Sequence, residues 1–363
     1  MNKQWSKEKI WSWYKARPWI RGCNYMSADC ANRIDQWQEL GFEERFKTTE
    51  EELALMQETG FNSIRIILEF LVWDKEHDGF TERFERYLSL CAKYGISCMV
   101  TLANDCLRPK SLEVTKLGEQ SFDIGYHGGR KLSQHGSLGM GYHEALDDPE
   151  KAPRYFEMVR EIVKRYKNDD RIVIWDAYNE VGCSGRRNVS MPNLKKIFDI
   201  IREIDPIQPV TSCVWDYNPD RPESLSEVGK YCLENSDIIS YHCYGGYENH
   251  IKLIAKLRDG RPIVCTEWLA RCFNDNVQEL FPLFFLEKVG CYNWGFVAGK
   301  YQTFEPWNSV WENYEKNPNF KCDFTKWFHD LYRPSHRPYD PHEIEIIKRF
   351  CTLSDKYFAE NMK

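Results

Sequence analysis

Hydrophobic positions along the chain follow two alternating patterns. Short runs rich in β-branched and aromatic residues predict strands, whereas apolar residues spaced three and four apart predict amphipathic helices. The expected strands lie at residues 19–25, 61–68, 96–102, 172–178, 209–214, 238–244, 262–267 and 290–297. The clearest expected helices lie between them, at residues 50–59, 80–94, 153–166, 191–204 and 277–288.

This alternation predicts an α/β fold, a (β/α)8 TIM barrel, with residues 1–363 forming a single catalytic domain. The barrel core is expected at about 18–305. An open doubly wound sheet is the alternative, but no Gly-x-Gly-x-x-Gly follows the first strand, as dinucleotide-binding versions require. In a barrel, the catalytic groups are expected at the carboxyl ends of the strands.

Two stretches depart from the repeat. Residues 107–146 form a long glycine-rich insertion after the third strand, which we interpret either as a lid over the substrate or as a mobile excursion. Its histidines, His127, His135 and His143, are spaced eight residues apart, which matches no common metal-ligand pattern. The second stretch, about 321–363, is a C-terminal extension expected to pack on the barrel through a helix at 342–361.

Charge and hydropathy exclude several classes of partner. The chain has 49 Lys+Arg and 55 Asp+Glu, a net charge of −6, so it lacks the basic excess that binds nucleic acid or anionic lipid. The most apolar stretch, 281–298, contains Glu287 and Lys288 and is too polar to span a bilayer. Residues 1–10 lack the apolar segment of a secretory signal, so we expect a cytoplasmic protein. The sequence leaves the oligomeric state open.

The cysteines indicate free thiols. Fourteen are scattered from Cys23 to Cys351 without any Cys-x-x-Cys pair, and many lie in apolar runs, where a thiol acts as a small hydrophobe. Free thiols are typical of a reducing compartment. No metal site is expected from this spacing.

Two glutamates occupy the positions where a barrel carries its chemistry. Glu180 follows the fourth expected strand in the segment Trp-Asp-Ala-Tyr-Asn-Glu, and Glu267 ends the seventh. A single glutamate at such a place is more often a surface or helix-capping residue. Two carboxylates over one pocket suit glycosidic bond cleavage, in which one donates a proton and the other supports the oxocarbenium-like centre. The pair, with Asn179 directly before Glu180, therefore favours catalysis.

These residues resemble the signature of the retaining glycoside hydrolases of clan A, most closely glycoside hydrolase family 5, the cellulase and mannanase family. The resemblance covers about residues 19–304. It implies that Glu180 is the acid/base, that Glu267 is the nucleophile, and that Asn179 binds the sugar 2-hydroxyl. It also implies a reaction without cofactor.

Further positions carry the same resemblance. Arg65 in the second strand matches the family's arginine beside the nucleophile, and His242-Cys-Tyr244 matches its His-x-Tyr. Arg65 is thus expected to hold Glu267 ionised, because a neighbouring cation lowers the pKa of a carboxyl group. The acid/base, Glu180, needs the opposite environment, since a buried acid that faces a like charge has a raised pKa. Tyr244 is expected to hydrogen-bond the nucleophile.

Two tryptophans and one departure complete the expected site. Trp294 matches the tryptophan beneath the first sugar, and Trp268, beside Glu267, is a second candidate for stacking on a sugar face. The family often has a histidine after the third strand, whereas this chain has Asn104 and Asp105. Recognition of the bound sugar is therefore expected to differ here.

The predicted function is a retaining β-glycoside hydrolase that cleaves β-linked oligosaccharides or small glycosides by double displacement. Exo action is expected for two reasons. Polymers do not enter cells, so a cytoplasmic enzyme would act on short imported sugars, and the 107–146 loop could close one side of the cleft. The carboxyl groups of Glu180 and Glu267 should lie about 5–5.5 Å apart, as in retaining enzymes. The alternatives are an endo-acting β-1,4-glycanase, a non-catalytic carbohydrate-binding barrel, and a metal-dependent barrel hydrolase or lyase, for which only His242 and Asp105 qualify as ligands.

Overall fold

The computed structural model describes residues 4–106, 116–120 and 145–361. Its parallel strands form one eight-stranded sheet in the order β5-β4-β3-β2-β1-β8-β7-β6. An isolated parallel bridge between Val214, just after β5, and Tyr241 of β6 brings the two ends of this sheet together, so that the barrel is nearly closed. All eight expected strands are confirmed. Their bounds are β1 Arg21–Asn24, β2 Ser63–Ile67, β3 Ser97–Thr101, β4 Ile172–Asp176, β5 Val210–Thr211, β6 Ile239–His242, β7 Ile263–Trp268 and β8 Gly290–Trp294.

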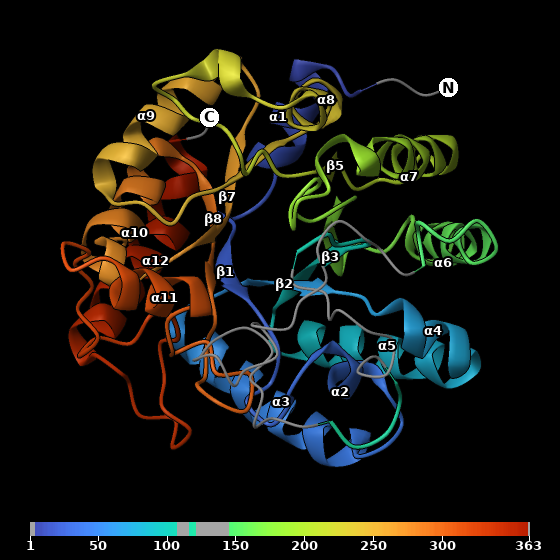
Figure 1. Ribbon diagram of the computed structural model, residues 1–363, viewed down its shortest axis with the longest axis horizontal. Helices are drawn as coiled ribbons and strands as arrows, with labels where there is room; N and C mark the ends of the chain where they lie inside the picture. The colour runs from blue at the N-terminus through green and yellow to red at the C-terminus, as the bar shows by residue number, and fades with distance from the viewer. Residues whose placement is uncertain (1–3, 107–115, 121–144, 362–363) are drawn as a thin grey trace.

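Helices surround the strands (Figure 1). Those facing the sheet or its ends are α1 Lys7–Lys15, α2 Arg33–Trp37, α3 Phe42–Thr59, α4 Phe70–Lys75, α5 His77–Lys93, α6 Ala152–Tyr166, α7 Met191–Ile204, α8 Glu227–Asn235, α9 Tyr247–Leu257, α10 Val277–Glu287, α11 Asn308–Lys316 and α12 Pro341–Asn361. The five clearest helical segments are confirmed as α3, α5, α6, α7 and α10. The hydrophobic pattern does not predict α1, α2, α4, α8, α9 or α11.

Local sequence explains how the units repeat. In α6, the buried residues recur three and four positions apart and so lie on one helical face. They include Tyr155, Met158, Val159 and Ile162. In α3, the helix ends at Gly60, whose φ of 95° is the left-handed conformation that glycine adopts without strain. The chain then enters β2 at Ser63. The helix end at Gly60 thus lets the chain turn from α3 into β2 within a few residues.

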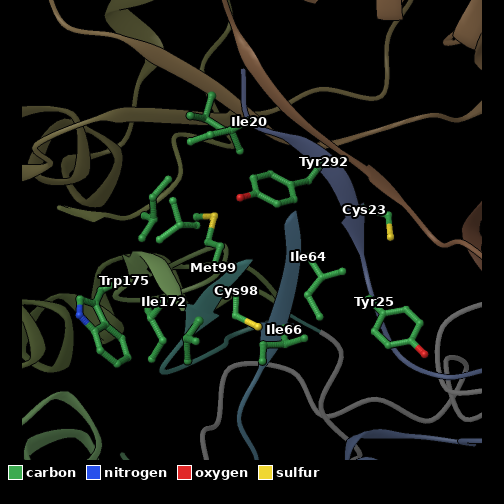
Figure 2. Close-up of a cluster of buried hydrophobic side chains, with 14 of the residues drawn as sticks. Ile20, Cys23, Tyr25, Ile64, Ile66, Cys98, Met99, Ile172, Trp175 and Tyr292 are labelled. Atoms are coloured by element: carbon green, nitrogen blue, oxygen red, sulfur yellow. The ribbon is translucent and has the colours of Figure 1, made fainter. Parts of the chain in front are cut away.

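The strands carry apolar side chains on their outer face, and polar side chains join apolar ones inside the barrel. Successive side chains of a strand point to opposite faces. In β2, the Ser63 hydroxyl hydrogen-bonds to the Tyr292 hydroxyl of β8 at 2.8 Å, whereas Ile64 and Ile66 belong to the hydrophobic core cluster. Figure 2 shows part of that cluster, with side chains from several neighbouring strands. Arg65 shares the inward face with Ser63, and this register brings its charge into the barrel.

The C-terminal extension is joined to the barrel by a buried ion pair. Arg271, just after β7, donates from Nε and Nη2 to the two carboxylate oxygens of Glu343 in α12, at 2.9 and 2.6 Å. Its Nη2 also donates to the carbonyl of Asp330 at 2.9 Å. Helix α12 packs against α10 and α3 on the outside of the barrel (Figure 1). The expected helical tail and its packing are confirmed.

Some expectations concern residues that the structure does not describe. Most of the 107–146 insertion, including His127, His135 and His143, lies outside the described residues. Among the residues that are described, no helix is both long and apolar enough to cross a membrane. The single-domain organisation stays a prediction.

The Arg271–Glu343 pair gives a test of how the extension is held. Replacing Glu343 with Ala leaves the buried guanidinium without its carboxylate, which should lower the free energy of unfolding by about 3–5 kcal/mol. Denaturant unfolding followed by tryptophan fluorescence measures this loss. The exposed Glu345→Ala variant on the same helix is the control and should unfold as the parent does. Equal stability of the two variants would contradict the anchoring role.

Candidate active site

A cavity of about 830 Å³ lies at the carboxyl ends of the strands. Its volume is in the range of small-molecule sites. The end of β4 contributes Asn179 and Glu180, the end of β6 contributes His242, and β7 contributes Glu267. Further lining residues are Arg33, Cys106, Trp215, Asp216, Tyr217, Asn218, Pro219, Asp220, Cys243, Tyr244, Asn249, Leu253, Trp294, Trp307, Ser309 and Glu312. The structure thus brings both predicted glutamates to one cavity.

Glu180 occupies an unusual backbone conformation. Its φ is 44°, in the left-handed region that non-glycine residues seldom adopt and that is frequent at functional sites. Its amide N–H faces the Cys213 sulfur at 3.4 Å, and its carbonyl accepts from the amide of Cys183 at 2.9 Å. These contacts fix the turn that follows β4 and so the direction of the carboxylate.

The two glutamates meet at His242. The His242 Nδ1 lies 2.9 Å from Glu180 Oε1 and 3.4 Å from Glu267 Oε2. One oxygen of each carboxylate and the imidazole nitrogen all lie within 4.8 Å of one another. Retaining glycosidases hold their carboxyl groups about 5–5.5 Å apart, whereas inverting enzymes need about 6.5–9.5 Å. The short approach of the oxygens fits the retaining spacing.

Arg65 connects three strand ends inside the barrel. Its Nη1 donates to Glu267 Oε1 at 2.8 Å and to Asn24 Oδ1 at 2.7 Å. Its Nε and Nη2 donate to Asp176 Oδ2 at 3.0 and 2.7 Å, and Nη2 also donates to Asn179 Oδ1 at 2.5 Å. The guanidinium side chain is fully buried. It therefore fixes the positions of Glu267 and Asn179 together.

Two further hydrogen bonds orient the site. Tyr244 donates its hydroxyl to Glu267 Oε2 at 2.8 Å, as expected, and its ring lies edge-on to Trp307 with centroids 4.9 Å apart. The Asn179 amide donates from Nδ2 to Asn104 Oδ1 at 2.7 Å. Asn104, where the family often has a histidine, thus holds the side chain that precedes Glu180.

Burial dominates the protonation of both glutamates. It raises the pKa of Glu180, against the lowering effects of hydrogen bonds from Cys106 and Cys183 and of the Arg65 charge. It also raises the pKa of Glu267, although His242, Arg65 and the Tyr244 hydroxyl act in the opposite direction. Arg65 acts on the Glu267 pKa in the expected downward direction, but burial outweighs it, so the net pKa of Glu267 is raised.

His242 stays neutral at neutral pH. Burial is the largest influence on it and lowers its pKa to about 4, with the nearby Arg65 charge acting in the same direction. A neutral imidazole carries one N–H donor and one acceptor nitrogen. With the proton on Nδ1, His242 donates to Glu180 without adding a charge to the site.

The two predicted tryptophans lie in different places. Trp294 at the end of β8 lines the cavity, as a sugar-stacking residue must. Trp268 does not: it is 1% exposed and packs on Phe281 and Phe284 of α10, with centroids 6.4 and 5.2 Å away. Because Glu267 points inward, the next residue points outward to the helices. The prediction that Trp268 contacts sugar is corrected by this placement.

Comparison with known proteins bears directly on this site. A sequence model of the family described as Cellulase (glycosyl hydrolase family 5) matches residues 28–283, which is most of the chain and contains both glutamates. The chain belongs to glycosyl hydrolase family 5. It is therefore a retaining glycoside hydrolase, and the non-catalytic barrel is set aside as an alternative.

Solved structures share the fold of this family 5 enzyme. An exo-β-1,4-mannosidase from Opitutaceae bacterium strain TAV5 aligns with TM-score 0.57 and 17% identity, over 93% of this chain and 60% of its own. A family 5 mannosidase from Rhizomucor miehei, in complex with mannosyl-fructose, aligns with TM-score 0.56 and 16% identity over 95% of both chains. A GH5_18 protein from Streptomyces cattleya, in complex with GlcNAc, aligns with TM-score 0.58 and 11% identity, over 94% of this chain and 81% of its own. No curated protein matches the sequence.

Two residues that hold this family 5 site together, Asp176 and Asn24, are not predicted from the sequence, and Asn104 is predicted only as a departure from the family pattern. Asp176 and Asn24 accept hydrogen bonds from Arg65, and Asn104 accepts one from Asn179. Strand alternation was the available signal for Asp176, because it ends β4 two residues after the inward position of Ile174. No comparable signal identifies Asn24 as a partner of Arg65, whereas Asn104 is marked by its position, where the family often has a histidine.

Replacing Arg65 with Lys tests the connection. An ammonium keeps the charge but cannot reach four acceptors in the planar geometry of guanidinium, so kcat/KM should fall about 100-fold, equivalent to roughly 2.7 kcal/mol. Steady-state kinetics on an aryl β-glycoside measures the change.

Arg271→Lys is the matched control, because Arg271 is also buried and bidentate but lies outside the cavity. It should lower stability and leave the kcat/KM of the folded protein near the parental value. An Arg65→Lys variant as active as this control would overturn the role of Arg65.

Proposed function

We propose that this enzyme hydrolyses β-linked oligosaccharides or small β-glycosides by double displacement, with Glu267 as nucleophile and Glu180 as acid/base. The observation that carries the proposal is the approach of their carboxylate oxygens within 4.8 Å over one cavity. Their different partners support the assignment of roles. Glu267 accepts from a guanidinium and a phenol, whereas Glu180 faces an imidazole and two thiols.

In the first step, Glu267 attacks the anomeric carbon while Glu180 gives its proton to the departing oxygen. A covalent glycosyl ester forms on Glu267 and the glycosidic bond breaks. In the second step, Glu180, now ionised, takes a proton from water, and the water oxygen displaces Glu267 from the sugar. Arg65 and Tyr244 donate to the Glu267 carboxylate and stabilise it as leaving group.

The raised pKa of Glu180 suits this cycle. A carboxyl group that remains protonated above its ordinary range, about 4.3, can still act as an acid in weakly acidic solution. The pKa of Glu267 is raised as well, but the direct contacts of Arg65 and Tyr244 with its carboxylate favour its anion, so Glu267 is the first of the coupled pair to ionise. One proton shared between the two carboxyls is the state from which the reaction begins.

The surrounding residues hold the sugar. Asn179 presents an amide beside Glu180, with one Nδ2 hydrogen left after its bond to Asn104, and this donor suits the sugar 2-hydroxyl. Trp294 supplies an aromatic surface on the cavity wall for the CH face of the ring. His242, neutral and in contact with both carboxylates, completes the floor of the subsite.

Exo action on a short substrate is the finer part of the proposal. The segment Trp215–Asp220 and the residues Trp307, Ser309 and Glu312 line the cavity beyond the two glutamates. We expect them to limit the length of the sugar chain that the cavity can hold. An exo-β-1,4-mannosidase and a second mannosidase are among the structures with this fold, which supports testing mannosides first. The cytoplasmic location likewise remains our proposal.

The two carboxylates should respond differently to replacement. Glu180→Ala should lower kcat about 10²–10⁴-fold on substrates with poor leaving groups and far less with activated aryl groups, because the lost function is proton donation. Glu267→Ala should abolish turnover of both substrate types. Added azide should give a β-glycosyl azide with Glu180→Ala and an α-glycosyl azide with Glu267→Ala.

The exposed Glu248→Ala variant on α9 controls for loss of a carboxylate outside the cavity and should keep parental kinetics. Substantial turnover by Glu267→Ala, without azide, would contradict its role as nucleophile.

Product analysis separates exo from endo action. β-1,4-linked manno- and gluco-oligosaccharides labelled at the reducing end should lose one sugar at a time, and monosaccharide should be the first product. Chromatography of early time points measures this order. Internal cleavage to labelled fragments of mixed length would instead establish an endo-acting β-1,4-glycanase.

A further inference from the structure

Two thiols lie beside the proposed acid/base. Cys106 follows β3, and Cys183 lies three residues after Glu180. The two Sγ atoms and one carboxylate oxygen of Glu180 all lie within 4.8 Å of one another, and all three residues are partly exposed. Cys106 also lines the cavity. A solute that enters the cavity can therefore reach this cluster.

The backbone holds the two cysteines in place. The Cys106 amide donates to Asn104 Oδ1 at 3.0 Å, and the Cys183 amide donates to the Glu180 carbonyl at 2.9 Å. Asp105 joins the two loops, because its Oδ2 accepts from the Gly182 amide at 2.8 Å and its carbonyl accepts from the Ser184 hydroxyl at 3.0 Å. The cluster is thus part of a fixed loop pair rather than a chance approach of surface side chains.

The proposed reaction does not need these thiols. Both hydrogen-bond to the Glu180 carboxyl, and Cys106 also hydrogen-bonds to Cys183. A hydroxyl could provide the same contacts. Two sulfurs and a carboxylate are, however, a ligand set typical of Zn²⁺ and other thiophilic cations, and three protein ligands leave a fourth position open to water.

We propose that Cys106, Cys183 and Glu180 form an inhibitory site for a thiophilic divalent cation such as Zn²⁺. Binding of the ion does not depend on the proposed function. Only the resulting inhibition rests on it, because the ion would occupy the proposed acid/base, Glu180. On binding, each thiol releases a proton to solvent and forms a metal–sulfur bond, and the Glu180 carboxyl releases to solvent the proton that it would give to the leaving group, with no change of oxidation state. A metal-bound Glu180 carboxylate has no proton to give the leaving group, so turnover stops until the ion dissociates.

The geometry requires only small side-chain movements. With Zn–S bonds of about 2.3 Å and tetrahedral angles, the two sulfurs would lie about 3.8 Å apart. Their present separation is within 4.8 Å. A competing group, Glu180 with His242 and Glu267, shares one carboxylate with this site. In that group Glu267 is already held by Arg65 and Tyr244, which favours the thiol site.

Inhibition by Zn²⁺ tests the proposal. Each protein is assayed with increasing Zn²⁺ and, separately, with Mg²⁺, and its rate is divided by its own rate with chelator. The parent should be inhibited by Zn²⁺ and not by Mg²⁺, reversibly on adding chelator. Cys106→Ser, Cys183→Ser and the double variant should each weaken Zn²⁺ inhibition at least about tenfold, since even residues that only support a ligand have effects of this size.

Cys322→Ser is the matched control. Cys322 is partly exposed and hydrogen-bonds to Cys272, but neither residue lines the cavity. Its inhibition constant should equal that of the parent. An unchanged constant in the double variant would overturn the proposal.

A spectroscopic measurement detects metal binding at this site without an activity assay. Cd²⁺ bound by thiolates gives an ultraviolet charge-transfer band. It is recorded in a Cys322→Ser background, so that the partly exposed pair Cys272 and Cys322 does not contribute. The band should appear with the parental cluster, persist in Glu267→Ala, and disappear when Cys106 and Cys183 are replaced. A protein that shows the band but hydrolyses no glycoside would contradict the proposed function alone, and a protein that hydrolyses but shows no band would contradict the metal site alone.

Discussion

The active site depends on one buried arginine. Arg65 extends from β2 into the barrel and contacts Asp176 and Asn179 at the end of β4 and Glu267 in β7. Removing a cation and two carboxylates from water is costly, and only well-formed hydrogen bonds and mutual attraction offset the cost. The guanidinium meets this condition because its planar donors reach four acceptors at once. The spacing of the two glutamates follows from where this arginine holds Glu267.

Burial raises both carboxyl pKa values, so the difference between the two glutamates comes from their partners. Glu267 is bound by a full positive charge and by a phenol, and both stabilise its anion. Glu180 contacts a neutral imidazole and weakly donating thiols, none of which brings a charge to it. The first environment favours an anion that attacks and departs, and the second favours an acid that gives and regains a proton. The roles of nucleophile and acid/base are therefore assigned from the groups that contact each glutamate, because burial shifts the pKa of both in the same direction.

Much of the architecture could be predicted from the sequence because strands and helices have distinct hydrophobic periods. The strand ends also placed Glu180 and Glu267 correctly at the cavity. The alternation of side chains within a strand would also have placed two residues correctly. It directs Trp268 outward to the helices and Asp176 inward to Arg65. Short helices such as α2 and α4, with five and six residues, are too brief to show a period. The approach of Cys106 to Cys183 comes from two different loops, and only the fold brings them together.

The most direct measurement of the central claim is to trap the intermediate. A β-glycoside fluorinated next to the anomeric carbon, with a good leaving group, slows the second displacement so that the glycosyl-enzyme accumulates. Peptide mapping by mass spectrometry should then find the sugar attached to the peptide that contains Glu267, in a one-to-one ratio with protein. Attachment at Glu180, or an unlabelled enzyme whose first product has the inverted anomeric configuration, would contradict the account.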